Sequence, residues 1–415
     1  MELVIPSRPL GRLDRLARTT LLGLLSHLQG GELTIIDESE QPARQWRCGA
    51  QSGIVASVRV CDARFWRRLL LGGSIAAGET WVEGMWESSE LAQVVQLLAR
   101  NLPLLDRLER RLSWLTFPLN RLRHLKNRNT LTGSRANIAA HYDLGNAMYQ
   151  GFLDQHMQYS SAVYPSEQAT LDEAQAHKLD LICQRLELSP EDHLLEIGTG
   201  WGGLAIHAAR HYGCKVTTTT ISQAQHDYAR AWIEREGLSD RITLLLEDYR
   251  QLEGQFDKLV SIEMIEAVGH AFLPGYFQQL SRLLRPGGRM LLQAITIADQ
   301  RFDSYLKGVD FIQRYIFPGG CLPSVSHMTE LLTRHTDMTL VRLHDHGVHY
   351  AKTLREWCQR FLAMKPELLR QGYSEDFIRL WHFYFAYCEG GFLERTISLV
   401  HFEAAKPGSG SWSGA

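Results

Sequence analysis

Short apolar runs alternate with amphipathic segments through the middle of the chain. The runs expected to form strands are HLLEIG (193–198), KVTTTTI (215–221), ITLLLED (242–248), KLVSIEM (258–264) and MLLQAIT (290–296), and the expected helices cover 204–212, 222–237 and 272–284. Because parallel strands need a long crossover between them, this alternation predicts a doubly wound parallel sheet with helices on both faces. The fold class is therefore α/β.

The chain is long enough for two domains. Its 415 residues are 45% hydrophobic and 22% charged, which is typical of a soluble globular protein. We expect a smaller mixed α/β domain over 1–125, a catalytic domain over 126–405 and a disordered tail over 406–415. Outside the alternating region, strands are expected at 30–37, 53–60 and 397–404, and helix at 91–100 and through most of 351–396.

Composition argues against several classes of protein. The apolar stretches at Thr19–Leu28 and Met290–Ala298 are shorter than the roughly 20 residues that span a bilayer, and no signal-peptide cleavage site follows Leu28. The seven cysteines form no CxxC pair and no metal-ligand spacing, so we expect neither a disulfide framework nor a metal site. We expect a cytoplasmic protein without a nucleic-acid partner.

Positive charge collects in the N-terminal part of the chain. Residues 1–128 contain 18 Lys/Arg against 13 Asp/Glu, and seven of the basic residues lie within Arg107–Arg128 among Leu, Trp and Phe. Such a segment suits the headgroup layer of an anionic membrane, but a solvated basic face with a linker explains it equally well. A second membrane-surface element, or else a helix packed on its own domain, is indicated by one helical face that carries Leu10, Leu13, Ala17, Leu21, Leu24 and Leu28.

A glycine-rich turn lies between the first strand of the alternating region and the helix that follows. Residues 196–203 are Glu-Ile-Gly-Thr-Gly-Trp-Gly-Gly, in which Gly198, Gly200 and Gly202 permit a tight turn and the close approach of a ligand to the helix N-terminus. The GxGxG spacing, preceded by Glu196, resembles the class I S-adenosylmethionine (SAM) methyltransferases. A dinucleotide-binding enzyme and a plain strand–turn–helix junction are the alternatives.

The ends of the next two strands supply further candidate contacts. No Asp or Glu ends the second strand, where dinucleotide folds bind the ribose hydroxyls, so Gln225 is the candidate for that role. Ser222 and Gln225 also match an S-x-x-Q capping box, which would compete for the same side chain. Asp248 and Tyr249 follow the third strand, where we expect either an adenine contact or a strand-end turn.

Eight motifs then occur in order along the chain. They are HYDLGN (141–146), MQYSSA (157–162), LEIGTGWGG (195–203), TTISQAQ (219–225), EDYR (247–250), SIEMIEAVG (261–269), RYIFPGGCLPS (314–324) and YCEGGF (387–392). Together they resemble the cyclopropane-fatty-acyl-phospholipid synthase family, which includes mycolic acid methyltransferases. The resemblance covers about residues 130–405, and residues before it are more weakly similar to the extra domain of the longer bacterial members. It implies a Rossmann-like SAM methyltransferase that transfers a methyl group to a cis double bond of a lipid acyl chain.

The resemblance also implies roles for individual residues. It assigns SAM contacts to Tyr159, Ser160, Glu196, Gly198, Gly200, Gly202, Thr220, Gln225, Asp248 and Tyr249. The active site of the family, which binds a bicarbonate ion, matches Ser161, Glu266, Gln293, Ile295 and Tyr350, and a cysteine of the family that has been assigned as a catalytic thiol matches Cys388. The chain departs from the family at Ser161, which replaces Cys, at Gln293, which replaces His, and at Ala267, where a His often stands.

Methyl transfer to an alkene leaves a carbocation, so ring closure needs a base that removes a proton from the new methyl group. Bicarbonate would supply that base if Ser161 and Gln293 still donate to it beside Glu266. If they do not, the product would be a mid-chain methyl or methylene branch. Phe377, Trp381, Tyr384 and Cys388 recur at helical spacing and would form one stripe on a helix. We expect this stripe to form either part of the core or the wall of an acyl-chain tunnel.

We therefore expect an enzyme that forms cyclopropane fatty acids on unsaturated phospholipids, bound peripherally at the inner face of the cell membrane, with a homodimer left open. The alternative is a lipid C-methyltransferase that stops short of ring closure. A non-catalytic lipid- or SAM-binding protein is disfavoured by Glu266, Tyr350 and the glycine-rich turn. A small-molecule O- or N-methyltransferase is disfavoured by the basic N-terminal domain and the family motifs.

Overall fold

The computed structural model describes residues 10–50, 52–106 and 145–408. The basic segment Arg107–Arg128, most of the HYDLGN motif and most of the tail lie outside the described residues, so the predictions made on them are not tested. Within the described residues, no helix is both long and apolar enough to cross a membrane.

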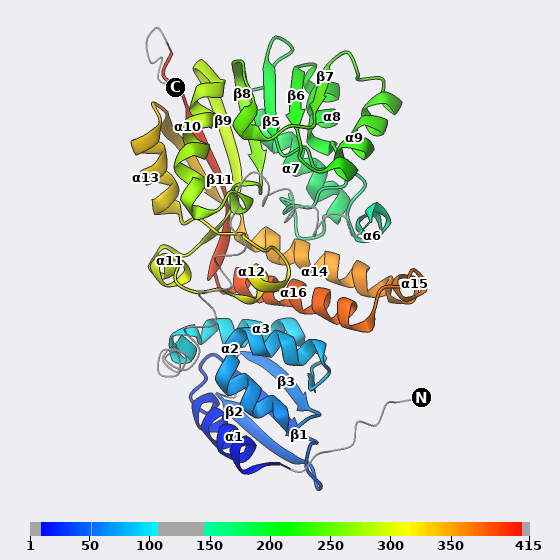
Figure 1. Ribbon diagram of the computed structural model, residues 1–415, viewed down its shortest axis with the longest axis vertical. Helices are drawn as coiled ribbons and strands as arrows, with labels where there is room; N and C mark the ends of the chain where they lie inside the picture. Colours follow the sequence, from blue (N-terminus) through cyan, green and yellow to red (C-terminus); the bar gives the residue numbers. More distant parts are fainter. Residues whose placement is uncertain (1–9, 51, 107–144, 409–415) are drawn as a thin grey trace. The chain divides into compact units, whose positions relative to one another are not determined.

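The chain divides into two compact units, shown in Figure 1. The first unit comprises 1–123, 309–314 and 358–396, and the second comprises 124–308, 315–357 and 397–415. The chain thus leaves the second unit twice and returns to it twice. The predicted boundary at residue 125 accounts for the first crossing only; whether 1–125 folds by itself stays a prediction.

The second unit is built on a seven-stranded sheet. In spatial order the strands are β10 (Thr339–Asp345), β11 (Ile397–Ala405), β9 (Leu284–Ile297), β8 (Phe256–Ile262), β5 (His193–Ile197), β6 (Lys215–Thr219) and β7 (Ile242–Leu245). Neighbours from β9 to β7 pair in parallel, whereas β11 is antiparallel to both of its neighbours. The predicted doubly wound sheet is confirmed. Its strand order reverses beside β5, and ligands bind at such a reversal in open α/β sheets.

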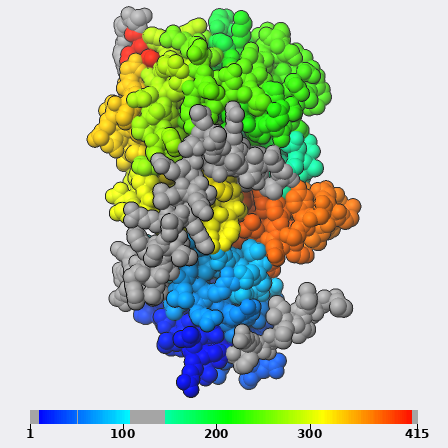
Figure 2. All heavy atoms as spheres, viewed as in Figure 1, coloured from blue at the N-terminus to red at the C-terminus, as the bar shows by residue number. Residues whose placement is uncertain are grey.

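Helices cover both faces of this sheet because alternate residues of each strand point to opposite sides. Leu194 belongs to a core formed with α7 (Leu171–Arg185) and α8 (Gly203–Tyr212), whereas the adjacent Leu195 belongs to a second core formed with α10 (Leu273–Leu283) and α13 (Val325–His335). The space-filling view in Figure 2 shows the green residues of this unit as a closely packed surface. The other helices that begin in this unit are α6 (Asn146–Phe152), α9 (Gln223–Arg235), α11 (Asp299–Tyr305) and α14 (Gly347–Ala363).

The first unit is a mixed α/β structure, as expected from the sequence. Its sheet has the order β2 (Arg44–Gly49), β1 (Gly31–Asp37), β3 (Ile54–Val60) and β4 (Trp86–Glu87), with β1 parallel to β3 and the other pairs antiparallel. In the described part of this unit, the helices are α1 (Arg12–Leu25), α2 (Arg64–Val82), α3 (Leu91–Arg100), α15 (Lys365–Arg370) and α16 (Glu375–Leu393), and α12 (Phe311–Tyr315) begins in it. The expected catalytic domain included α16, which here packs against α2 and α3.

The amphipathic helix near the N-terminus, α1, packs on its own unit. Ala17 and Leu21 are buried, and so is Arg18, whose guanidinium donates to the buried carboxylate of Asp37 at 2.9 Å. The indole N–H of Trp66 donates to the same oxygen at 2.9 Å. This buried network explains why a basic residue lies on the packed side of the helix, since its charge is paired there.

Candidate active site

The glycine-rich turn joins β5 to α8 where the strand order reverses. Gly198, Gly200 and Gly202 have positive φ angles of 102°, 53° and 100°, a conformation that residues with a side chain rarely adopt. The N–H groups of Gly198 and Thr199 both donate to the carbonyl of Thr219 at 3.0 Å, which ties the turn to β6. A Cβ at Gly200 would meet no atom within 4 Å, so the turn is open to a ligand at that residue and fits SAM.

Glu196 lies beneath this turn with its side chain buried. Its Oε2 accepts the hydroxyl of Thr218 at 2.5 Å, and that hydroxyl lies 2.7 Å from Oγ1 of Thr199 in the turn. Burial raises the pKa of Glu196 to about 8, against the opposing effects of the Thr218 hydrogen bond and of the Lys178 charge. The contacts of Glu196 therefore hold the turn in place from below.

The predicted ribose contact, Gln225, is fixed by Thr220. The hydroxyl of Thr220 donates to Oε1 of Gln225 at 2.9 Å and accepts the N–H of Ser222 at 3.1 Å. Ser222 caps α9 by accepting the backbone N–H of Gln225 at 3.3 Å, so only this half of the capping box forms. Since Oε1 is held by Thr220, a ribose hydroxyl would be bound by the NH2 group of Gln225.

Asp248 and Tyr249 form the turn that follows β7. The buried carboxylate of Asp248 accepts the backbone N–H of Arg250 at 3.0 Å and its guanidinium at 2.6 and 2.8 Å. The ring of Tyr249 packs edge-on against Tyr276, and burial raises the pKa of Tyr249 to about 12. The strand-end turn is thus present, and the adenine contact of both residues stays a prediction.

The segment that carries Ser160 crosses the start of α8 at very close range. A Cβ at Gly203 would lie 2.3 Å from the carbonyl oxygen of His156, so only glycine allows the two backbones to pass. The fully buried Lys178 of α7 fixes the same segment, because its Nζ donates to Oγ of Ser160 at 2.9 Å and to Oε1 of Gln158 at 2.8 Å. Burial lowers the pKa of Lys178 to about 8.

Aromatic rings surround the other predicted SAM contact of this segment, Tyr159. Its ring centroid lies 5.3 Å from those of Tyr149 and Trp357, which are both buried. Tyr149 lies 4.9 Å from Trp201 of the glycine-rich turn. This cluster places Tyr159 close to the turn and excludes water from that side of it.

A glutamate that was not predicted from the sequence, Glu263, joins three of the predicted active-site residues. Its Oε1 accepts the N–H of Ser161 and the side-chain amide of Gln293, both at 2.8 Å, and its Oε2 accepts the hydroxyl of Tyr350 at 2.6 Å. Desolvation raises the pKa of Glu263, whereas these hydrogen bonds and the Lys178 charge act in the opposite direction. We call the three donors and this carboxylate the cradle.

The backbone of Glu263 is strained. Its φ angle is +49°, and its N–H donates to the carbonyl of Gln293 at 2.7 Å. A left-handed conformation costs a residue with a Cβ about 1–2 kcal/mol, and such strain clusters at functional sites. The sequence signal that would have found this residue is a second acidic residue three positions before Glu266, at the carboxyl end of a predicted strand.

The orientation of Gln293 is set by two residues behind it. Nη1 of Arg185 lies 2.8 Å from Nδ1 of His401, and Nε2 of His401 lies 2.8 Å from Oε1 of Gln293. Because a guanidinium only donates, Nδ1 accepts and the imidazole proton is on Nε2. The oxygen of the Gln293 amide therefore faces His401, and its NH2 group faces Glu263 and the carbonyl of Ser161.

Glu266 and Ile295 form a second contact next to the cradle. Oε1 of Glu266 accepts the N–H of Ile295 at 2.5 Å, and no donor among the described residues reaches its buried Oε2. Desolvation and the charge of Glu263 raise the pKa of Glu266 to about 8, so it holds a proton at neutral pH. Between the two glutamates, Met264 would lie 3.6 Å from a Cβ at Gly198, which brings the pair beside the glycine-rich turn.

The residues that the resemblance assigns to a bicarbonate ion do not leave a place for one in this arrangement. The N–H of Ser161, the amide of Gln293 and the hydroxyl of Tyr350 bind Glu263, and the N–H of Ile295 binds Glu266. The hydroxyl of Ser161, which replaces the family cysteine, donates to the carbonyl of Ala162 at 2.9 Å. Every donor of the set thus has an acceptor within the protein.

Cys388 lies on α16, which belongs to the first unit, whereas the cradle residues belong to the second. Desolvation raises the pKa of its thiol above the ordinary value, which disfavours the reactive thiolate. Its neighbours on the stripe form core: the buried Trp381 packs against Phe377 and Tyr384 with ring centroids 5.7–5.8 Å apart. A catalytic role for Cys388 stays a prediction.

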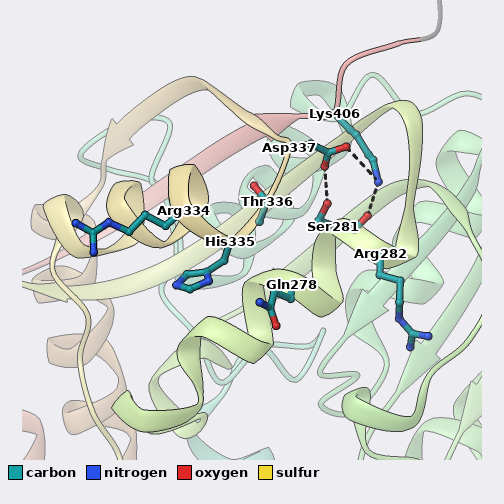
Figure 3. A pocket seen from close by; sticks show the side chains of 8 residues that line it. All are labelled: Gln278, Ser281, Arg282, Arg334, His335, Thr336, Asp337 and Lys406. Carbon is teal, nitrogen blue, oxygen red and sulfur yellow. Dashed lines mark hydrogen bonds and ion pairs between the residues drawn. The ribbon is translucent and has the colours of Figure 1, made fainter.

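A surface depression of 520 Å³ lies elsewhere on the second unit, between α10, α13 and the residue after β11 (Figure 3). Basic side chains that line it make contacts within the unit. Lys406 donates to the carbonyl of Ser281 at 2.8 Å and lies 3.7 Å from Asp337. Arg282 donates to the carbonyl of Leu252 at 2.7 Å. None of the predicted site residues lines this depression, so we place the active site at the cradle and the glycine-rich turn.

Comparison with known proteins agrees with a SAM-binding site at the glycine-rich turn. The profile of the mycolic acid cyclopropane synthetase family matches residues 129–402. The chain is 38% identical to the cyclopropane-fatty-acyl-phospholipid synthase of Escherichia coli K12 over 83% of this chain and 86% of that protein. It is 37% identical to the tuberculostearic acid methyltransferase UfaA1 of Mycobacterium tuberculosis over 82% of this chain and 81% of that protein.

Solved structures agree. The cyclopropane synthase MmaA2 from Mycobacterium tuberculosis superposes with a TM-score of 0.62 at 30% identity, over 66% of this chain and 98% of that one. The mycolic acid cyclopropane synthase CmaA1, solved with S-adenosylhomocysteine, superposes with a TM-score of 0.61 at 31% identity, over 66% and 98%. With the open glycine-rich turn and the doubly wound sheet, these matches show that the chain belongs to the mycolic acid cyclopropane synthetase family of SAM-dependent methyltransferases.

Proposed function

We propose that this protein transfers a methylene unit from SAM to the cis double bond of unsaturated phospholipid acyl chains and so forms cyclopropane fatty acids. The observation that carries the proposal is the position of Glu263 and Glu266 beside the glycine-rich turn. A carboxylate next to the expected position of a sulfonium methyl group can stabilise a carbocation there. The similarity to the Escherichia coli synthase supports phospholipid as the substrate.

SAM supplies an electrophilic methyl group. An alkene is a weak nucleophile, so the protein must hold the two reactants in line, and positioning of this kind can supply much of the rate enhancement. Gln225 and Ser160 would hold the co-substrate, and the rings around Tyr159 would exclude water that could capture the cation. Ring closure then requires the loss of one proton from the methylated chain.

A second candidate product is a mid-chain methyl or methylene branch. The 37% identity to the tuberculostearic acid methyltransferase favours it, as do Ser161 and Gln293, which replace the Cys and His of the resemblance. The first chemical step is the same for both products. The difference lies in whether a hydride shifts along the chain before the methyl group loses its proton, which gives the methylene branch, or in whether a reductant afterwards supplies a hydride, which gives the methyl branch.

The location at the membrane is also part of this proposal. Leu13 and Leu16 of α1 are 62% and 65% exposed, and the basic segment Arg107–Arg128 would add attraction to anionic lipid. We propose peripheral binding at the inner face of the cell membrane, with residues 1–125 as the docking part and with a homodimer left open. Activity on anionic vesicles should then fall as salt is raised, because salt screens that attraction.

The test is to incubate the purified full chain with SAM and vesicles of cis-monounsaturated phospholipid and to analyse the fatty acids by mass spectrometry. A gain of one CH2 without hydrogen uptake on mild hydrogenation supports the ring, and a gain with hydrogen uptake supports a methylene branch. Gly200→Val, which should block the turn, provides the negative control. The absence of any mass gain on every unsaturated lipid would rule out both products.

A further inference from the structure

The charge state of Glu263 follows from its hydrogen bonds. The N–H of Ser161, the NH2 group of Gln293 and the hydroxyl of Tyr350 all donate to its two oxygens. A carboxylate that accepts three hydrogen bonds is best satisfied when it is ionised, because a protonated carboxyl needs an acceptor for its own hydrogen. The Arg185–His401 contact prevents the Gln293 amide from supplying that acceptor, since it turns the amide oxygen away.

The second glutamate takes the opposite state. Oε2 of Glu266 has no hydrogen-bond donor among the described residues, whereas Oε1 accepts the N–H of Ile295. Two neighbouring carboxylates cannot both ionise easily, so the one with fewer donors keeps the proton. The pair therefore presents one anion, Glu263, at the centre of the donors.

We propose that Glu263 is the base of this enzyme: its carboxylate takes the place of a bound bicarbonate ion and accepts the proton that leaves the methylated acyl chain. The proposal rests on the proposed function. The left-handed backbone at Glu263 supports it, because the strain persists where it aims the carboxylate at the three donors.

The step balances without a further reagent. After methyl transfer the acyl chain carries a carbocation. One C–H bond of the new methyl group breaks, its electron pair forms the third bond of the ring, and the proton passes to an oxygen of Glu263. If a hydride first shifts from the methyl-bearing carbon to the cationic carbon beside it, the same oxygen takes a proton from the methyl group and the electron pair of that C–H bond forms a methylene double bond. The proton then leaves to solvent before the next turnover.

The test compares Glu263→Gln and Glu263→Gly with the wild-type full chain, in buffer freed of carbon dioxide and in buffer with added bicarbonate. We expect wild-type product formation to be unchanged by bicarbonate. In Glu263→Gln, the rate of product formation should fall roughly 100-fold or more, as expected for the removal of a general base, while SAM affinity measured by calorimetry is unchanged. Glu263→Gly removes the carboxylate at a φ angle that suits glycine, so this variant should fold. It should be inactive without bicarbonate and should regain turnover when bicarbonate is added.

Glu187→Gln is the matched control. Glu187 also has a left-handed backbone, with φ of +53°, but its side chain is exposed and pairs with Arg289 at 2.8 Å. This variant should keep full activity. Wild-type turnover that stops without bicarbonate, or a Glu263→Gln variant within a few-fold of wild type, would overturn the proposal.

A measurement without turnover separates this proposal from the proposed function. Binding of 13C-labelled bicarbonate, followed by NMR, should be absent in the wild type and present in Glu263→Gly. If the wild type modifies no lipid, the proposed function fails, and the binding comparison still decides what occupies the cradle. Bicarbonate bound to the wild type, or none bound to Glu263→Gly, contradicts the place assigned to Glu263.

Discussion

Arg185 donates a hydrogen bond of 2.8 Å to Nδ1 of His401, which leaves the imidazole proton on Nε2. The N–H at Nε2 then donates to the amide oxygen of Gln293. Burial lowers the pKa of His401 well below its ordinary value, so the ring stays neutral and keeps this arrangement across the physiological range. Two residues behind the active site thus determine which end of an amide faces Glu263. Their role is to position Gln293.

His401→Phe should therefore lower kcat about tenfold while leaving SAM affinity unchanged, because the Gln293 amide loses the partner that orients it. His401→Gln should restore most of the activity, since its amide oxygen can accept from Arg185 and its NH2 group can donate to Gln293. Steady-state kinetics with calorimetry measure both effects. Equal losses in the two variants would indicate a packing role instead.

Gly203→Ala should weaken SAM binding and lower the free energy of unfolding by about 1–3 kcal/mol, as in other overpacked sites. Its Cβ would lie 2.3 Å from the carbonyl oxygen of His156 and would displace the segment that carries Ser160. The matched control is Gly275→Ala in α10, where a Cβ meets nothing within 4 Å. That control should be neutral or should stabilise by about 0.4–1 kcal/mol, measured by urea unfolding.

Glu266 should make stability depend on pH in a defined direction. Its pKa is raised to about 8 in the folded protein, above its ordinary value of 4.5, so between these values the folded state binds more protons than the unfolded state. Stability from this group is therefore lost as pH rises from about 4.5 to 8. Glu266→Gln should flatten the fall of Tm between pH 6 and 8, relative to the wild type. A wild-type slope that survives in the variant would assign the effect to other groups, such as Glu196.

Asp37→Ala should destabilise the first unit by about 3–5 kcal/mol, because it leaves the buried Arg18 without this partner and removes the acceptor of the Trp66 indole. Arg370→Ala breaks an exposed ion pair with Glu367 on α15 and should change stability by less than about 1 kcal/mol. Urea unfolding followed by tryptophan fluorescence measures both. Similar effects of the two changes would mean that the Asp37 network contributes little.

The central sheet could be predicted because the strand and helix signals are local. Each strand from β5 to β9 carries its own apolar run, and the glycine-rich turn follows β5 directly in the sequence. β10 was not predicted, since most of its residues are exposed and it has no apolar run of this kind. The grouping of α16 with α3 was also missed, because contacts such as Gln96–Glu394 join residues 298 positions apart.

The active site shows the same limit. Motif resemblance indicated Ser161, Gln293 and Tyr350 individually, but the residue that joins them was missed. Glu263 meets them across 102, 30 and 87 positions of sequence, and its role depends on a backbone angle that no local pattern predicts. The change at Gln293 becomes intelligible once this carboxylate is known, because the amide donates to it. Ser161 donates through its backbone N–H, which any residue but proline would supply, so the contact does not explain the serine side chain.

The last strand of the sheet, β11, has a consequence for synthesis of the protein. His401 belongs to this strand and pairs in register with Gln293 of β9, more than a hundred residues earlier in the chain. Between them the chain builds α15 and α16 in the other unit. On the ribosome, the Gln293 amide therefore cannot be oriented until β11 has emerged. Truncation before residue 397 should yield polypeptides that contain the glycine-rich turn but lack a complete active site.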